Sequence, residues 1–395
     1  MKNYWQEVKL GDICEYSRNR ISISEVNLCN YVSTENLLKE RAGKTIADSI
    51  PEQANLCEYN KGCTLISNIR PYFKKIWFAN TRGGCSNDVL VYKPNNGIND
   101  KWLYYLLSQD SFFNFVMSGT KGTKMPRGDK SQIMKFPVAL PPLDEQRKIA
   151  GVLSALDDKI ELNNKINRNL EAQAQAIFKS WFIDFEPFKN GKFIDSELGK
   201  IPEGWKVKEL GKVSKNIREK VASRTNIPVL SAIKEGHLIL SEEYFSKQVY
   251  SKSLSKYILV KENDYAYNPA RVNIGSLGRN TICSLGCVSP VYVVFEIDDN
   301  YLAFFDLYFK MKSFKNEVKL RASGSVRQTL SYDDFSLIKV IYPPKSVSSK
   351  FNKLSAVLSE KIIRNKKESR SLAQLRDTLL PKLMSGEIDI SNIAV

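Results

Sequence analysis

Two long segments of the chain place apolar residues at spacings that alternate between four and three. In the first segment the recurring positions are Ile149, Leu153, Leu156, Ile160, Asn163, Asn167, Leu170, Ala174 and Ile177. In the second they are Phe351, Ser355, Leu358, Ile362, Asn365, Ser369, Leu372, Arg376 and Leu379. This repeat predicts two long helices, and the polar residues near each middle favour one fixed alignment with a partner helix. We expect the two helices to pair with each other as an antiparallel coiled coil, with a dimer of two chains as the alternative.

The segment before each helix has a different pattern. Short apolar runs bounded by turn residues, such as those at 63–67 and 257–260, are typical of β-strands. Each segment also holds one aromatic-rich stretch, at about 101–117 and about 302–319, that fits a helix. We therefore expect a compact α+β domain ahead of each long helix.

The two halves of the chain match each other in order and register. WQEVKLGDI from Trp5 matches WKVKELGKV from Trp205, 200 positions later. FPVALPP, ending at Pro142, matches IKVIYPP, ending at Pro344, at an offset of 202. Segments that keep their order and a nearly constant spacing indicate an internal repeat. The predicted fold class is α+β, with two globular domains separated by two long helices in a pseudo-twofold repeat.

The repeat also sets the expected domain boundaries. Residues 183–204 contain two prolines and three glycines, which is typical of a linker. The expected order is a globular domain at 1–142, a helix at 143–182, the linker at 183–204, a second globular domain at 205–344 and a second helix at 345–386.

The charge of the chain favours an anionic partner. Its 59 Lys and Arg residues against 43 Asp and Glu residues give a net charge of +16 at pH 7. Such an excess favours nucleic acid, because neutralising phosphates releases condensed counterions. The alternative is a basic protein with no polyanionic ligand.

Cysteine and histidine usage argues against several kinds of site. The seven cysteines form no CxxC pair, and His237 is the only histidine. Catalytic triads and His-rich metal sites therefore do not fit the sequence. Free thiols are typical of a reducing compartment, and no apolar run reaches the roughly twenty residues of a membrane span. We expect a cytoplasmic protein that does not enter a membrane.

Three fragments suggest enzymes but lack essential parts. AGKT at 42–45 resembles the end of a phosphate-binding loop, yet Leu38 stands where that loop needs glycine. NPAR at 268–271 lacks the aromatic residue that adenine methyltransferases stack on a flipped base. Asp306 with EVK at 317–319 has the outline of a Mg²⁺-dependent nuclease, although both lie in one helical stretch. A self-contained nuclease stays the alternative function.

Two sets of residues are better candidates for reading DNA. Arg70 and Arg271 match between the repeats, although a structural ion pair is an equal alternative for both. The loops at 118–130 and 322–334 combine glycine and hydroxyl residues with basic side chains that suit phosphates and base edges. Because the loops differ in side chains, they predict two different half-sites. A coiled-coil adaptor that binds proteins is a third hypothesis. The predicted DNA-binding residues are Arg70, Lys74, Lys75, Lys121, Thr123, Lys124, Arg127, Arg271, Asn273, Arg279, Ser325, Arg327 and Gln328.

Several motifs resemble one protein family. LPPLDEQRKIAGVLSALDDKIELNNKINRNLEAQAQAIFKSWF at 140–182 resembles the first central helix region of the specificity subunits of Type I restriction–modification systems, and LLPKLMSGEI at 379–388 resembles their C-terminal ending. GCVSPVYVVF at 286–295 and the two Gly-rich loops are similar to their target-recognition domains. The resemblance covers nearly the whole chain. The second helix departs from the pattern, because PPKSVSSKFNKL replaces the Pro-Pro-Leu-x-Glu-Gln form.

The resemblance implies a non-catalytic subunit that binds a bipartite double-stranded DNA sequence, with one target-recognition domain on each half. It implies two methyltransferase (M) subunits and restriction (R) motor–nuclease subunits as partners. S-adenosylmethionine, Mg²⁺ and ATP would bind to those partners, and no cofactor is expected in this chain.

Overall fold

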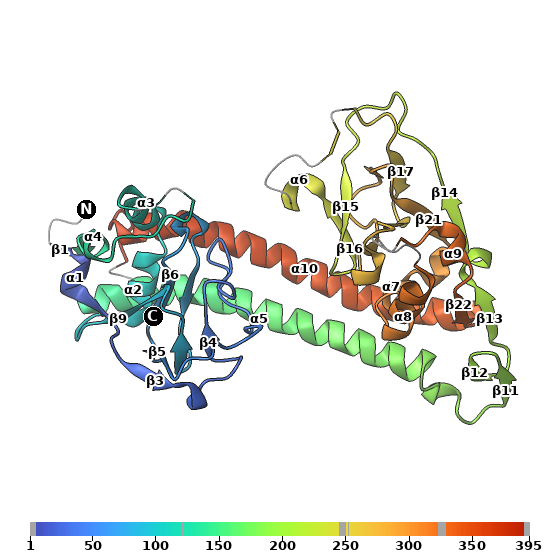
Figure 1. The fold of residues 1–395 in the computed structure, drawn as a ribbon, viewed down its shortest axis with the longest axis horizontal. Coiled ribbons are helices and arrows are strands. Elements are labelled where there is room, and N and C mark those ends of the chain that lie inside the picture. The colour runs from blue at the N-terminus through green and yellow to red at the C-terminus, as the bar shows by residue number, and fades with distance from the viewer. Residues whose placement is uncertain are drawn as a thin grey trace. The chain divides into compact units, whose positions relative to one another are not determined.

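The computed structural model describes residues 5–120, 122, 124–244, 250–251, 253–322 and 329–390 (Figure 1). The chain forms two compact units. Unit 1 consists of residues 1–164 and 365–395, and unit 2 consists of residues 165–364. Both divisions fall inside a long helix, either α5 (Leu143–Phe182) or α10 (Lys345–Met384), so each unit contains half of each helix.

The globular part of unit 1 contains short strands and helices. In chain order they are β1 (Gln6–Lys9), α1 (Leu10–Ile13), β2 (Cys14–Tyr16), β3 (Arg20–Ser22), η1 (Ile23–Glu25), β4 (Tyr31–Val32), β5 (Asn55–Tyr59), β6 (Thr64–Ser67), η2 (Pro71–Phe73), β7 (Ile76–Phe78), β8 (Gly83–Cys85), β9 (Val89–Pro94), α2 (Asp100–Leu107), α3 (Asp110–Ser118), α4 (Lys130–Ile133) and β10 (Pro137–Leu140).

In unit 2 the connection between α5 and the globular part, residues 183–204, is itself folded. In chain order the elements of unit 2 are η3 (Glu186–Phe188), β11 (Phe193–Ser196), β12 (Gly199–Pro202), β13 (Lys206–Glu209), η4 (Leu210–Lys212), β14 (Ser214–Ile217), β15 (Leu230–Ile233), β16 (His237–Leu240), α6 (Ser241–Tyr244), β17 (Ile258–Lys261), β18 (Tyr265–Tyr267), η5 (Val272–Ile274), β19 (Leu277–Arg279), β20 (Leu285–Val288), β21 (Val293–Ile297), η6 (Asp299–Tyr301), α7 (Leu302–Tyr308), α8 (Lys312–Arg321), α9 (Tyr332–Ser336) and β22 (Lys339–Tyr342).

The internal repeat is visible in the order of the strands. One four-stranded sheet of unit 1 has the order β2-β9-β6-β7, and one of unit 2 has the order β14-β21-β18-β19, which are the matching strands. In both units the strand that opens the globular part pairs antiparallel with the strand that closes it, β1 with β10 and β13 with β22. The α+β fold with two repeated domains is therefore confirmed.

The remaining sheets differ between the units. Unit 1 has a second four-stranded sheet, β3-β5-β8-β4, in which β4 and β8 run parallel. Unit 2 has two separate pairs instead, β15 with β16 and β17 with β20. The four-stranded sheet and the pair of opening and closing strands are thus a shared framework, whereas the sheets around them differ in strand order.

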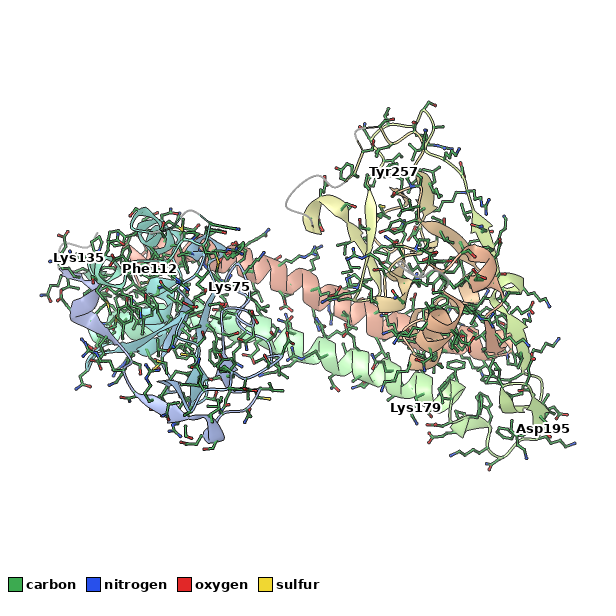
Figure 2. All side chains as sticks on the ribbon, in the orientation of Figure 1. Lys75, Phe112, Lys135, Lys179, Asp195 and Tyr257 are labelled. Carbon is green, nitrogen blue, oxygen red and sulfur yellow. The ribbon has the colours of Figure 1, made fainter. Side chains whose placement is uncertain are left out.

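The single aromatic helix expected in each domain is two helices. In unit 1, α2 ends and α3 begins around Gln109, whose backbone is extended at φ −70° and ψ 150°. In unit 2, Met311 has nearly the same angles, φ −66° and ψ 149°, before α8. The break lets the rings of both helices enter one core, because Trp102 of α2 and Phe112 of α3 are both fully buried. Figure 2 labels Phe112 within the globular part of unit 1.

The long helices pair antiparallel through the predicted stripe. Within unit 1, Asp157 of α5 contacts Arg376 of α10, and Asn163 donates to Glu368, so residue numbers rise along one helix as they fall along the other. The side chains at the predicted contact positions are all buried or half-buried, namely Leu153, Leu156, Ile160, Leu170, Ile177, Leu358, Ile362, Leu372 and Leu379. In the described part of the chain, no helix is both long and apolar enough to cross a membrane.

Each long helix is fastened to its own globular part by a buried polar residue near its start. Gln146 is 2 % exposed, donates to the carbonyl of Pro141 at 2.9 Å and accepts from the backbone of Asn99 at 2.9 Å. Its counterpart Ser348 is fully buried and donates to the carbonyl of Asn300 at 2.8 Å. The glutamine of the LPPLDEQ motif is therefore a structural residue that orients α5.

Candidate nucleic-acid interface

The two basic loops predicted in unit 1 lie against each other. The backbone N–H of Arg70 donates to the carbonyl of Pro126 at 2.8 Å, and that of Gly128 donates to the carbonyl of Asn68 at 3.4 Å. These bonds join the loop 68–75 to the loop 122–130. The predicted DNA-binding residues of unit 1 that the structure describes, Arg70, Lys74, Lys75, Lys124 and Arg127, therefore lie on two joined loops, although these loops are about 50 residues apart in the sequence.

A third loop, which is not among the residues predicted to bind DNA, completes this surface. The backbone N–H of Glu40 donates to the carbonyl of Phe73 at 2.9 Å, and that of Arg41 donates to the carbonyl of Lys74 at 3.0 Å. The loop 37–44 adds three basic residues, Lys39, Arg41 and Lys44. We call the segments 37–44, 68–75 and 122–130 together the unit 1 loop cluster.

Arg70 sits in an unusual position. Its backbone is left-handed, with φ 50°, and its side chain is half-buried. Its buried Nε has no hydrogen-bond partner within the part of the chain that the structure describes. A buried N–H of a charged group is costly to leave unmatched, so a ligand that accepted from it would bind favourably. The structural ion pair considered for Arg70 is not observed among the described residues.

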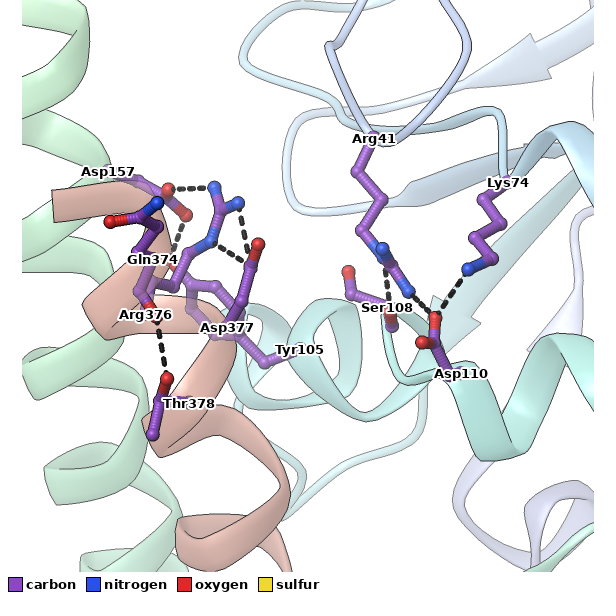
Figure 3. Close-up of polar contacts among 10 residues, drawn as sticks. All are labelled: Arg41, Lys74, Tyr105, Ser108, Asp110, Asp157, Gln374, Arg376, Asp377 and Thr378. Carbon is purple, nitrogen blue, oxygen red and sulfur yellow. Dashed lines mark hydrogen bonds and ion pairs between the residues drawn. The ribbon is translucent and has the colours of Figure 1, made fainter. Parts of the chain in front are cut away.

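The two lysines after Arg70 have different surroundings. Lys74 pairs with the carboxylate of Asp110 at 2.9 Å, and its side chain is 26 % exposed (Figure 3). The ammonium of Lys75 donates to the backbone carbonyl of Thr34, and burial lowers the pKa of Lys75. Both lysines are half-buried, and each is bound by a group of the protein, Lys74 by the Asp110 carboxylate and Lys75 by the Thr34 carbonyl.

The Gly-rich loop at 118–130 carries three exposed basic residues in its described part, Lys124, Arg127 and Lys130. Arg127 pairs with Asp88 at 3.2 Å, an exchangeable contact because both groups face solvent. Lys121 and Thr123 lie outside the described residues.

Unit 2 repeats the arrangement in part. The backbone N–H of Leu330 donates to the carbonyl of Pro269 at 3.2 Å, which joins the loop at 322–334 to the loop that carries Arg271 and Asn273. Arg271 is exposed and Asn273 is half-buried. Ser325, Arg327 and Gln328 lie outside the described residues.

Arg279 is held inside unit 2. Its Nη2 lies 2.8 Å from Asp306, and its Nη1 donates to Asn263 at 2.5 Å. Burial by itself would lower the pKa of Arg279. The charge of the Asp306 carboxylate and its hydrogen bonds act in the opposite direction, and the net pKa of Arg279 is raised. Tyr265 donates to the same carboxylate at 2.9 Å. This geometry favours a packing role for Arg279, and DNA contact by it stays a prediction.

Asp306 and Glu317, the two acids of the nuclease pattern considered from the sequence, are each paired with an arginine. Asp306 is bound by Arg279, and Glu317 pairs with Arg321 one turn along α8 at 3.2 Å. The described residues contain no group of three or more His, Cys, Asp or Glu side chains that could hold a metal ion. Nothing in this geometry supports hydrolysis by the chain.

Comparisons with known proteins identify the family to which the chain belongs. The profile of the Type I restriction modification DNA specificity domain matches residues 2–172. The chain is 30 % identical to the specificity subunit of the Type I restriction enzyme MjaIX of Methanocaldococcus jannaschii, over 94 % of this chain and 87 % of that protein. The chain belongs to the specificity subunits of Type I restriction–modification systems.

A second relative agrees with this assignment, and a solved structure shows the same fold. The specificity subunit of the Type I restriction enzyme HindI of Haemophilus influenzae is 25 % identical over 97 % of this chain and 99 % of that protein. The crystal structure of the specificity subunit from M. genitalium shares the fold with a TM-score of 0.57, at 16 % identity and 97 % coverage of both chains. As a specificity subunit, the chain is the non-catalytic, DNA-recognising component of a complex with modification and restriction subunits.

Proposed function

We propose that each globular domain reads one half of a bipartite DNA target. The observation that carries this proposal is the repeated sheet, β2-β9-β6-β7 and β14-β21-β18-β19, which bears different loops in the two units. The corresponding loops read TKGTKMPRG at 120–128 and GSVRQTLSY at 324–332. A shared framework with different side chains suits two different half-sites, because base edges are distinguished by the donors and acceptors presented to them.

We also propose that the long helices fix the distance between the two half-sites. Each helix has 40 residues, or about 60 Å at 1.5 Å per residue. Their stripe contains buried Asn163, which donates to Glu368 at 3.0 Å, and such polar contacts penalise a shifted alignment. A fixed alignment supports a constant gap between half-sites, as in other proteins with paired reading modules.

The same helices are the proposed docking surface for two methyltransferase subunits. Large apolar side chains are exposed on them, at Leu162, Val357, Ile363 and Leu375. Exposed apolar residues of this size along a helix are typical of protein interfaces. The methyltransferase subunits would supply S-adenosylmethionine, and the restriction subunits would supply the ATP- and Mg²⁺-dependent steps.

Exchanging one loop tests the proposal. The full chain is expressed with its methyltransferase subunits, and methylated adenines are mapped across the host genome to reveal the split motif. Residues 322–334 are then replaced by the corresponding loop of a relative. We expect one half of the motif to change while the other half and the spacer persist. A change in both halves would refute separate reading, and methylation or cleavage by the chain alone with Mg²⁺ and S-adenosylmethionine would refute the non-catalytic role.

A further inference from the structure

One carboxylate in unit 1 neutralises two cations of the loop cluster. Lys74 Nζ lies 2.9 Å from Asp110 Oδ1, and Arg41 pairs with the same oxygen (Figure 3). Arg41 also donates its Nε to the carbonyl of Ser108 at 2.6 Å, which fixes the guanidinium plane. Lys74 foremost, with Arg41, lowers the pKa of Asp110. The side chain of Asp110 is 63 % exposed, so its site opens to solvent.

The backbone that presents these cations is strained. Glu40 and Arg41 have φ values of 51° and 60°, and the N–H of Ala42 donates to the carbonyl of Lys39 at 3.2 Å across them. A turn of this mirror-image kind normally uses Asn-Gly or Asp-Gly. Lys74 is also left-handed, at φ 48°. Strain in non-glycine residues persists where neighbouring bonds hold it, and it gathers at functional sites.

The repeat shows that the fold requires neither the cation nor the carboxylate. The left-handed position of Lys74 is taken in unit 2 by Gly275, at φ 103°, which adopts this conformation easily. The first residue of α3 is Asp110, whereas the first residue of the matching helix α8 is Lys312. A purely structural ion pair is therefore an insufficient explanation for a strained lysine and its acid.

We propose that the Asp110 carboxylate stands in for a backbone phosphate of DNA and gives up Arg41 and Lys74 to that phosphate when DNA binds. This inference rests on the proposed function of the loop cluster in DNA reading. A carboxylate and a phosphate both present oxygens that accept charge-assisted bonds from the same two cations. In free protein Asp110 keeps the cations in place and reduces their attraction for DNA of any sequence. Asp110 is thus a positioning residue that sets the balance between non-specific and specific binding.

Asp110→Asn tests the exchange directly. The full chain with its methyltransferase subunits is titrated with a duplex carrying the mapped motif and with a random duplex of equal length, over a series of salt concentrations. We expect the variant to bind the random duplex on the order of tenfold more tightly. Binding to the motif should tighten less, so the ratio between the two affinities falls.

Glu15→Gln is the matched control. Glu15 is an exposed carboxylate of unit 1 that pairs with Lys93 at 3.2 Å, and it lies outside the loop cluster. Its loss removes the same charge from the unit. An equal gain in Glu15→Gln would overturn the proposal, because the effect would then be general electrostatics. Unchanged or weaker binding by a folded Asp110→Asn protein would overturn it as well.

Lys74→Gly provides a second variant with a different readout. Glycine keeps the left-handed backbone and deletes one cation. We expect the slope of log affinity against log salt to become shallower by about 0.9, as for one lost phosphate contact. The gain from Asp110→Asn should shrink in the double variant. An unchanged slope would overturn the inference, whereas a wild-type complex that binds both duplexes equally would instead refute the proposed function.

Discussion

Each globular domain contains a four-stranded sheet of the same strand order, but matching positions in the two domains hold different kinds of side chain. In unit 2, Arg279 at the end of β19 pairs with Asp306 of α7. In unit 1, the matching residues are Phe78 and Tyr104, whose ring centroids lie 5.7 Å apart. An ion pair and an aromatic pair thus fasten the same strand to the same helix. Two positions that change together and still contact each other in both units are packing positions.

The loops show the opposite behaviour. Lys74 and Gly275 share a left-handed backbone, but only unit 1 places a cation there. Its acid Asp110 has a lysine, Lys312, as its counterpart. Gly275 and Lys312 cannot form an ion pair with each other, so unit 2 does not replace the Lys74–Asp110 contact. The residues of unit 1 at these positions therefore point to a ligand rather than to packing. The comparison separates residues that hold the domain together from residues that read its target.

The largest expected loss of stability is at a leucine of α5 that is buried in the core of a globular part. Leu153 is fully buried in the core of unit 1, whereas Leu170 is half-buried in the stripe of α5. Leu153→Ala should lower the free energy of unfolding by about 3–4 kcal/mol, because the cavity cannot collapse easily. Leu170→Ala should cost about 1 kcal/mol, since less area leaves water. Urea unfolding followed by circular dichroism measures both, and equal losses would contradict this difference between core and stripe.

The next prediction tests whether the Arg279–Asp306 ion pair of unit 2 can be replaced by the aromatic pair found in unit 1, Phe78–Tyr104. Asp306→Ala leaves the largely buried Arg279 without its partner and should cost about 2–4 kcal/mol. The double variant Arg279→Phe with Asp306→Tyr copies unit 1 and should recover most of that loss, because it removes the unpaired charge. Unfolding free energies of the single and double variants measure the recovery. A double variant as unstable as the single one would show that the positions are not interchangeable.

Much of the framework could be predicted from the sequence, because matched segments such as those at Trp5 and Trp205 keep their register. The four-strand order could not, since strands of three to six residues carry little signal of their partners. The loop 37–44 could not be found either. Its Glu40 and Arg41 are unusual turn residues, and their conformation depends on bonds to Phe73 and Lys74 that only the folded chain provides.

The third effect concerns a buried acid of unit 2, Asp264, whose matching position in unit 1 holds a cysteine. Asp264 is 5 % exposed, and burial raises its pKa from 3.8 to about 6. The folded state therefore binds more protons than the unfolded state between these values, so stability falls as pH rises through this range. Asp264→Asn should recover about 2 kcal/mol at pH 7 and flatten the stability profile between pH 4 and about 6.

The matching residue in unit 1 is Cys63, just before β6, which supplies the control. Cys63→Ser should leave the pH profile of unfolding unchanged in that range, because it removes no acid that titrates there. A profile that stays steep in Asp264→Asn would show that another group controls it.

The smallest effect concerns the shared left-handed position. A Cβ atom at Gly275 would lie 2.4 Å from the carbonyl oxygen of Lys234, so Gly275→Ala should cost about 1–2 kcal/mol through strain and displacement of the backbone. Lys74→Gly should change stability by less than about 0.5 kcal/mol, because relief of strain offsets the lost ion pair and the greater freedom of glycine when unfolded. Thermal unfolding of the two variants distinguishes the sites. A large loss in Lys74→Gly would mean that the lysine supports the fold, and its strained backbone would then need no ligand to explain it.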